Sequence, residues 1–197
     1  MTSSMRQQSE RPARLSASDW AQAALDLMAE QGLAAVGVEP LARRLGVTKG
    51  SFYWHFPSRE ALLTAALEHW ESIEQETVFG KLEAISDPRD RLRALFQLVA
   101  HEVRSHVLYS ELLKALDHPV VKPVMERVSQ RRLDYLWASF RQSGLARTEA
   151  QHRARLAYAA YIGFLQLSLQ LQPRLHHDEF EAYVEHVMAT LIPPPAA

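Results

Sequence analysis

The chain has 197 residues, of which 47% are hydrophobic and 23% charged, and its formal net charge is −1. This composition is ordinary for a globular protein, and the absence of cysteine excludes disulfides, thiolate nucleophiles and cysteine-ligated zinc. No uncharged apolar run is long enough to span a membrane, and the polar N-terminal segment lacks the apolar core of a signal peptide. We therefore expect a cytoplasmic protein that has no membrane partner.

Apolar residues recur at helical spacing along the chain, so the sequence predicts an all-α protein of about nine helices. The first helix begins after Ser16, which forms a capping box with Asp19, and ends at Gly32. A second helix is expected over 39–45. A third begins after the N-cap Thr48 and ends before a proline, and a fourth covers 59–76.

The second half of the chain predicts five more helices. The fifth begins at Pro88, a short sixth covers 111–116, and a long seventh runs from Val121 to a Ser-Gly break at 143–144. The eighth is expected to start at Thr148, in capping-box spacing with Gln151, and to end before the proline at 173. The ninth covers 178–192 and precedes a proline-rich tail at 193–197.

The stretch LARRLGVTKGSFYWHF matches a helix-turn-helix pattern of two short helices joined by a turn that contains glycine. The second helix of such a motif enters the major groove of DNA, so its first turn must be small or polar. Thr48, Lys49, Gly50 and Ser51 meet this requirement. Phe52 and Phe56 are four residues apart and are expected to fix this helix to the core.

Three segments, LSASDWAQAALDLMAEQG, LARRLGVTKGSFYWHF and PSREALL, together resemble the tetracycline-repressor (TetR) family of bacterial one-component regulators. The resemblance covers residues 15 to about 68. It implies an N-terminal three-helix DNA-binding domain, and a C-terminal helical domain that binds a ligand and forms a homodimer. The sequence also lacks a nucleophile–base or metal-ligand constellation, so we expect that the chain is not an enzyme and needs no cofactor.

The resemblance assigns roles to individual residues. Lys49, Gly50 and Ser51 lie at base-reading positions, Tyr53 and His55 match a phosphate-contacting pair, and Arg59 matches a basic phosphate contact. Trp54 is left open between the edge of the core and the DNA.

Two positions depart from the family pattern. Gly37 stands where a hydroxyl side chain often caps the second helix, and Glu39 stands near an expected basic position, where it would repel a phosphate. Arg43 and Arg44 are expected either to compensate by binding phosphate or to form a solvated face.

The expected organisation is a flexible basic tail at 1–14, a DNA-binding domain at 15–62, a ligand-binding and dimerisation domain at 63–192, and the tail at 193–197. A dimer would place two recognition helices on half-sites of a palindromic operator. Because the eighth helix is apolar nearly all round, we expect the eighth and ninth helices to form the interface. The predicted interface residues are Leu156, Ala160, Gly163, Leu167, Tyr183, Val184, Val187 and Leu191.

A pocket is expected among helices five to eight, and its apolar character predicts a small apolar or aromatic effector. The predicted lining residues are Phe96, Val99, Val103, His106, Leu116, Met125, Trp137, Tyr161, Phe164 and Leu165. No metal motif occurs, although the adjacent His176 and His177 leave adventitious binding open. The leading hypothesis is a repressor that the effector releases from DNA. The alternatives are an activator and a regulator that needs no effector.

Overall fold

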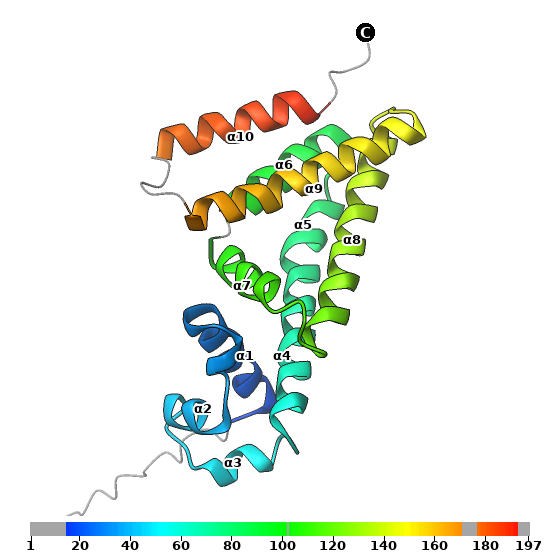
Figure 1. Ribbon diagram of the computed structural model, residues 1–197. Coiled ribbons are helices and arrows are strands. Elements are labelled where there is room, and N and C mark those ends of the chain that lie inside the picture. Colours follow the sequence, from blue (N-terminus) through cyan, green and yellow to red (C-terminus); the bar gives the residue numbers. More distant parts are fainter. Residues whose placement is uncertain (1–14, 102, 171–176, 193–197) are drawn as a thin grey trace, which may run out of the picture.

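The structure is a computed structural model that describes residues 15–101, 103–170 and 177–192. Within these ranges every regular element is helical, which confirms the predicted all-α fold (Figure 1). Both predicted tails, 1–14 and 193–197, lie outside the described residues. The elements are α1 (Ala17–Gln31), η1 (Leu33–Ala35), α2 (Val38–Arg44), α3 (Lys49–Tyr53), α4 (Arg59–Glu74), η2 (Gln75–Phe79), α5 (Gly80–Glu83), α6 (Pro88–His101), α7 (Val103–Lys114), α8 (Val121–Gln142), α9 (Arg147–Gln170) and α10 (His177–Leu191).

The N-terminal helices begin and end where the sequence predicts. The Asp19 backbone N–H donates to the Ser16 hydroxyl over 3.2 Å, and the Ser16 N–H donates to the Asp19 carboxylate over 2.7 Å, so the capping box is complete. Gly32 ends α1 with a φ of +83°. The turn between α2 and α3 passes through Gly46 at a φ of +68°, which a glycine adopts without strain.

The fourth helix is longer and less regular than predicted. Ser58 caps α4 by accepting a hydrogen bond from the Ala61 N–H over 3.1 Å. The helix then passes through η2, a π-helical turn, and continues as α5. No periodicity in the sequence indicated this turn. The predicted domain boundary between residues 62 and 63 falls inside α4.

Two helix starts in the second half differ from the prediction. The short sixth helix at 111–116 is instead α7, which begins at Val103 and ends at Lys114. The eighth helix, α9, begins at Arg147, so Thr148 lies inside its first turn and does not cap it. The Ala150 N–H donates to the Ala146 carbonyl over 2.9 Å, which places the cap two residues earlier than predicted.

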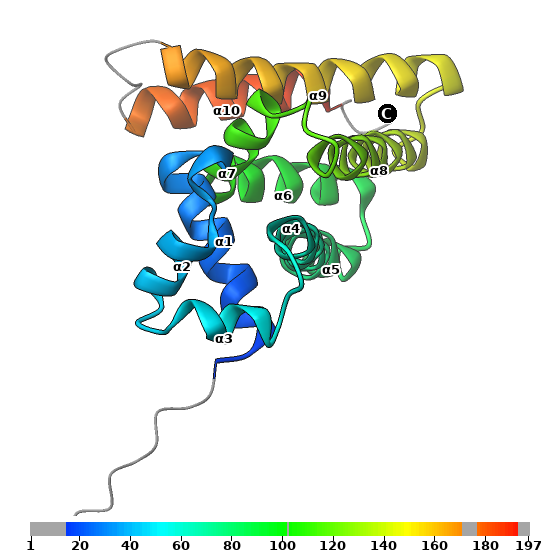
Figure 2. The same ribbon diagram turned by 60° about the horizontal axis from the view of Figure 1, so that its bottom comes forward.

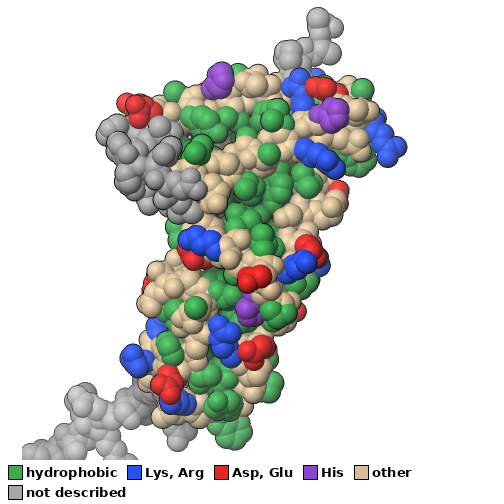
Figure 3. Space-filling view, in the orientation of Figure 1, with side chains coloured by type: hydrophobic (Ala, Val, Ile, Leu, Met, Phe, Trp, Pro, Cys, Tyr) green, Lys and Arg blue, Asp and Glu red, His purple; other side chains and the backbone are tan. Residues whose placement is uncertain are grey.

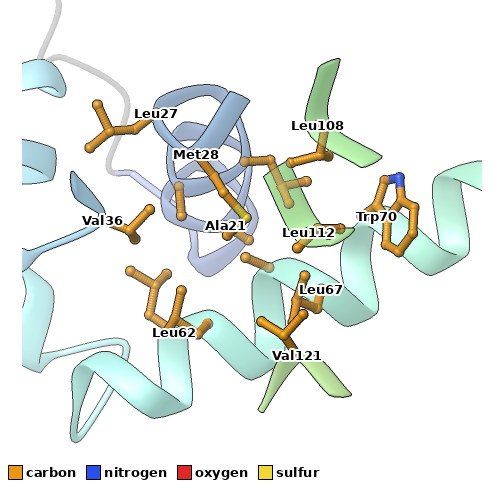
Figure 4. Close-up of a cluster of buried hydrophobic side chains, with 14 of the residues drawn as sticks. Ala21, Leu27, Met28, Val36, Leu62, Leu67, Trp70, Leu108, Leu112 and Val121 are labelled. Atoms are coloured by element: carbon orange, nitrogen blue, oxygen red, sulfur yellow. The ribbon is translucent and has the colours of Figure 1, made fainter. Parts of the chain in front are cut away.

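Two hydrophobic clusters hold the molecule together. One joins α1, α4, α7 and the start of α8, and Figure 4 shows Met28, Leu67 and Leu112 converging between these helices. The other lies among α6, α8, α9 and α10. In Figure 2, α9 and α10 run side by side across the end of the molecule opposite α3. Since α4 contacts both α1 and α8, it links the two ends mechanically.

Candidate nucleic-acid interface and ligand pocket

The inner face of α3 is anchored by aromatic packing. Phe52 is fully buried and Phe56 nearly so, which confirms that both belong to the core. The Phe52 ring meets Trp20 of α1 edge to face, with 5.4 Å between ring centroids, and lies 5.8 Å from the Phe56 ring. These contacts fix the orientation of α3 on the rest of the domain.

The outer face of α3 is exposed. Tyr53 is 63% exposed and Trp54 80%, so Trp54 does not belong to the core edge. Thr48 is the N-cap of α3 by position, but its side chain makes no capping hydrogen bond. A Cβ added at Gly50 would meet no atom nearer than 3.7 Å, so packing within the chain does not require this glycine. Figure 3 shows exposed hydrophobic side chains at the α3 end.

The basic side chains near α3 are held by acidic partners. Lys49 forms an ion pair with Glu39 of α2, and its hydrogen bond and charge lower the pKa of Glu39. Arg44 forms a two-pronged ion pair with Glu30 of α1, with nitrogen–oxygen distances of 2.6 and 2.7 Å. The sequence predicted that Glu39 would repel a phosphate, and the structure shows that it also binds Lys49. Contact of Lys49 with a base stays a prediction.

Arg59 makes a structural contact that the sequence did not reveal. Its Nε donates to the Val36 carbonyl over 2.5 Å, and its Nη2 donates to the Leu33 carbonyl over 3.0 Å. These bonds tie the start of α4 to the segment before α2. Contact of Arg59 with phosphate stays a prediction, as do the DNA contacts of the exposed Arg43 and the half-buried Ser51 and His55.

A cavity of about 150 Å³ lies among α4, η2, α6, α7, α8, α9 and α10. Figure 3 shows hydrophobic side chains gathered below α9, between α7 and α8. Five of the predicted lining residues are on its wall: Phe96, Val99, His106, Tyr161 and Phe164.

Four predicted lining residues lie elsewhere. Met125 and Leu165 are buried in the cluster around α1 and α4, because their positions on α8 and α9 point toward that cluster. Leu116 is exposed beyond the end of α7, and Trp137 lines a separate hollow between α8 and α9. The side chain of Val103 lies outside the described part of the chain.

The sequence analysis missed the charged groups of the cavity wall. Glu74 is buried at the end of α4, and its Oε1 accepts a hydrogen bond from Arg132 Nε of α8 over 2.8 Å. Its Oε2 accepts one from Arg131 Nη2 over 2.9 Å. Arg131 also binds Glu71 over 2.7 Å, and Arg127 binds Glu71 over 2.9 Å. This α4–α8 ion cluster consists of Glu71, Glu74, Arg127, Arg131 and Arg132.

Tyrosines surround the buried guanidinium. Arg132 lies 4.3 Å from the centroid of the Tyr109 ring and 5.8 Å from that of Tyr161. The Tyr109 and Tyr158 hydroxyls are 2.5 Å apart, and Tyr158 donates to Ser129 over 2.9 Å. Burial raises the pKa of Tyr161 to about 12 and that of Tyr109 further, so both hydroxyls are neutral at neutral pH.

The predicted dimer residues divide into three groups. Leu156 and Leu167 of α9 are more than half exposed, as expected of an interface. A Cβ added at Gly163, which lies between them on α9, meets no atom within 4 Å. Val184 and Leu191, in contrast, are buried among α6, α8 and α9 of their own chain. The remaining three, Ala160, Val187 and Tyr183, line the cavity.

No cluster of three or more histidine and carboxylate side chains suited to a metal occurs in the described residues. His176, and the side chain of His177, lie outside them. Among the helices described, none has the length and apolar character needed to cross a bilayer.

Residues 22–66 match the family of bacterial regulatory proteins called the tetR family. The chain is 29% identical over 134 residues to the transcriptional repressor KstR2 of Mycolicibacterium smegmatis, covering 64% of this chain and 62% of the relative. It is 48% identical over 46 residues to the class A tetracycline repressor from transposon 1721 of Escherichia coli, covering 23% and 21%. The chain thus spans less than two thirds of the length of these relatives.

Solved structures share the fold over most of the chain. Reduced NemR of Escherichia coli superimposes with a TM-score of 0.76 at 22% identity, covering 91% of this chain and 99% of that one. A putative regulator from Saccharomonospora viridis in complex with choline gives 0.78 at 18%, covering 88% and 95%. AibR in complex with isovaleryl coenzyme A and operator DNA gives 0.65 at 19%, covering 90% and 98%.

The matched curated relatives are transcriptional regulators, in agreement with the prediction that the chain is not an enzyme. The helix-turn-helix geometry of α2 and α3 agrees with the family match and the shared fold. Residues 22–66 match the DNA-binding part of the tetR family of bacterial regulatory proteins, and the chain as a whole shares the fold of the solved regulators named above.

Proposed function

We propose that the protein is a dimeric repressor whose affinity for its operator is lowered by a small apolar or aromatic effector. The observation that carries this proposal is the contrast between the two faces of α3. Phe52 and Phe56 pack one face of the helix against the core. Lys49, Tyr53 and Trp54 are the exposed residues of the other face. In this proposal residues 15–62 supply the DNA contacts, and 63–192 supply the pocket and the dimer interface.

The position of the cavity supports control by an effector. The end of α4 and the last three residues of η2 contribute to its wall, and five residues separate α3 from α4. An effector that shifts the end of α4 would change the separation of the two recognition helices, which must match half-sites about 34–36 Å apart. Equal separation in free and effector-bound crystals would contradict this mechanism.

The relatives support the same reading. KstR2 carries the name of a repressor, and AibR has been crystallised with both a small molecule and operator DNA. An activator, or a regulator without an effector, would bind DNA through the same surface. A thermal-shift screen of small molecules separates a regulator with an effector from one without, because a ligand that binds only the folded state raises its melting temperature. A reporter gene behind the selected operator separates a repressor from an activator.

The DNA contacts are tested on a sequence selected in vitro from a random pool, with affinity measured by fluorescence anisotropy. We expect the double variant Tyr53→Phe/His55→Ala to bind at least tenfold more weakly, since each lost phosphate hydrogen bond costs about 1 kcal/mol. The control is His186→Ala on α10, an exposed histidine at the opposite end of the molecule that does not line the cavity (Figure 1). Unchanged affinity in the first variant would refute the assigned contacts.

A further inference from the structure

The chemistry of the cavity wall restricts the kind of effector it can hold. Its lining is mostly apolar and aromatic, and Glu74 and Arg132 are its only carboxylate and guanidinium groups among the described residues. A dry apolar cavity of roughly 150 Å³ is large enough for a benzene-sized guest. The apolar part of an effector can therefore be a single ring. Glu74 and Arg132 determine which polar group the effector can carry.

Both oxygens of Glu74 already accept hydrogen bonds from arginines, so its negative charge is compensated within the chain. Oε1 accepts hydrogen bonds from both Nε and Nη2 of Arg132, and Oε2 accepts one from Arg131. The carboxylate lies at the centre of an ion cluster that contains three guanidinium groups and two carboxylates. A ligand ammonium group would have to displace an arginine from Glu74 and would then lie beside its charge.

Arg132, in contrast, has one donor nitrogen that no carboxylate engages. Its Nη1 is buried and makes no hydrogen bond of ordinary geometry to a described residue. The nearby tyrosine hydroxyls are neutral, so they bring no compensating negative charge. A buried charged donor without an acceptor is costly, and a ligand oxygen that reaches it recovers that cost.

We infer that the effector is a small apolar or aromatic molecule bearing a carboxylate, which the Arg132 guanidinium recognises through Nη1. This inference rests on the proposed function, because it names the ligand class for the same cavity. It also gives the effector a route to α4. A carboxylate at Nη1 would share the guanidinium of Arg132 with Glu74, the last residue of that helix, and its negative charge would weaken the attraction between Arg132 and Glu74.

The test uses three probes of nearly the same shape: 3-phenylpropanoate, 3-phenylpropanamide and 3-phenylpropylammonium. Dissociation constants are measured by calorimetry on the full-length protein. We expect the carboxylate to bind at least tenfold more tightly than the amide, and the ammonium to bind most weakly. Equal affinities, preference for the ammonium, or binding of none of the three at millimolar concentration would overturn the inference.

Two variants locate the recognition. Arg132→Met/Glu74→Gln removes both charges together, so that no unpaired carboxylate is created, and it should abolish the preference for the carboxylate while still binding the amide. Arg127→Met is the matched control, since this guanidinium is half exposed, belongs to the same cluster and does not line the cavity. If the double variant does not fold, Arg132→Lys serves instead, because it keeps the charge but loses Nη1. Persistence of the full preference in the variant used would overturn the inference.

Operator binding is measured separately with and without each probe. If the probes that bind also weaken DNA binding, but the carboxylate does not bind more tightly than the amide, then the inferred ligand class is wrong. The proposed control of DNA binding by an effector is then still supported. If the carboxylate binds through Arg132 and DNA affinity does not change, the ligand class stands and the proposed gating is wrong.

Discussion

Because Lys49 forms an ion pair with Glu39, we expect the DNA affinity of this protein to be sensitive to one exposed carboxylate. Lys49 lies in the first turn of the recognition helix α3, and Glu39 holds its ammonium group in the free protein. The substitution Glu39→Gln keeps the side-chain shape and removes the negative charge. Both side chains are about 60% exposed, so the fold does not depend on their contact.

The expected gain follows from counterion release. Each phosphate that a cation neutralises on duplex DNA adds about 0.9 to the slope of log affinity against log salt, which at 0.15 M salt corresponds to about fivefold in affinity. One lysine is freed in each protomer, so a dimer should bind roughly 25-fold more tightly, with a slope steeper by about 1.8. The assay is an anisotropy titration of the selected operator at several salt concentrations.

A matched control removes a carboxylate from a comparable exposed pair far from α3. Asp90→Asn, which releases Arg93 on α6, should leave both affinity and salt slope unchanged. Weaker binding by Glu39→Gln would refute the reasoning, because it would mean that Glu39 orients Lys49 for a base contact. An unchanged slope would show that Lys49 does not reach a phosphate.

Three further outcomes are expected. Phe52→Ala should lower the free energy of unfolding by about 3–5 kcal/mol, because it empties a fully buried site beside Trp20. In contrast, Trp54→Ala on the exposed face should change it by less than about 0.5 kcal/mol in denaturant titrations. Hydrogen bonds to the Gln97 carbonyl and to Glu181 raise the pKa of His101. The contribution of protonated His101 to stability is therefore complete below about pH 6.5 and is lost as the pH rises through its folded pKa. His101→Gln should melt at a lower temperature than the wild type at pH 6 but not at pH 9, and an equal difference at both would exclude this linkage. Gly163→Glu should convert the proposed dimer to folded monomers in sedimentation experiments, whereas Gly163→Ala should remain dimeric; a dimeric Gly163→Glu protein would place the interface elsewhere.

Much of the fold could be predicted because its signals are local. Ser16, Ser58 and Gly32 mark helix ends through hydrogen bonds and backbone conformation that depend on neighbouring residues only. The inner face of α3 could be predicted for the same reason, because Phe52 and Phe56 are one helical turn apart. The π-helical turn η2 could not be predicted, since its residues carry no local signal and tertiary packing decides its conformation.

The cavity was predicted less well because its charged wall depends on which helices meet. Glu74 and Arg132 are on different helices and are 58 positions apart, and in sequence each resembles an ordinary solvated side chain. Leu116 and Met125 have the apolar character of pocket residues, but one lies beyond the end of α7 and the other faces α1 and α4. Periodicity identifies a buried face without identifying the helix that covers it.

The π-helical turn determines where this chain can tolerate a change in length. A π turn contains one residue more than the α-helical ladder needs, so deleting a residue within Gln75–Phe79 can restore ordinary α-helical bonding while the flanking faces keep their directions. A deletion between Leu62 and Trp70 removes a residue from regular α-helix, where there is no extra residue to compensate for the loss. It would rotate the first part of α4 by about 100° relative to Glu71 and Glu74 and would separate the α1 contacts from the ion cluster.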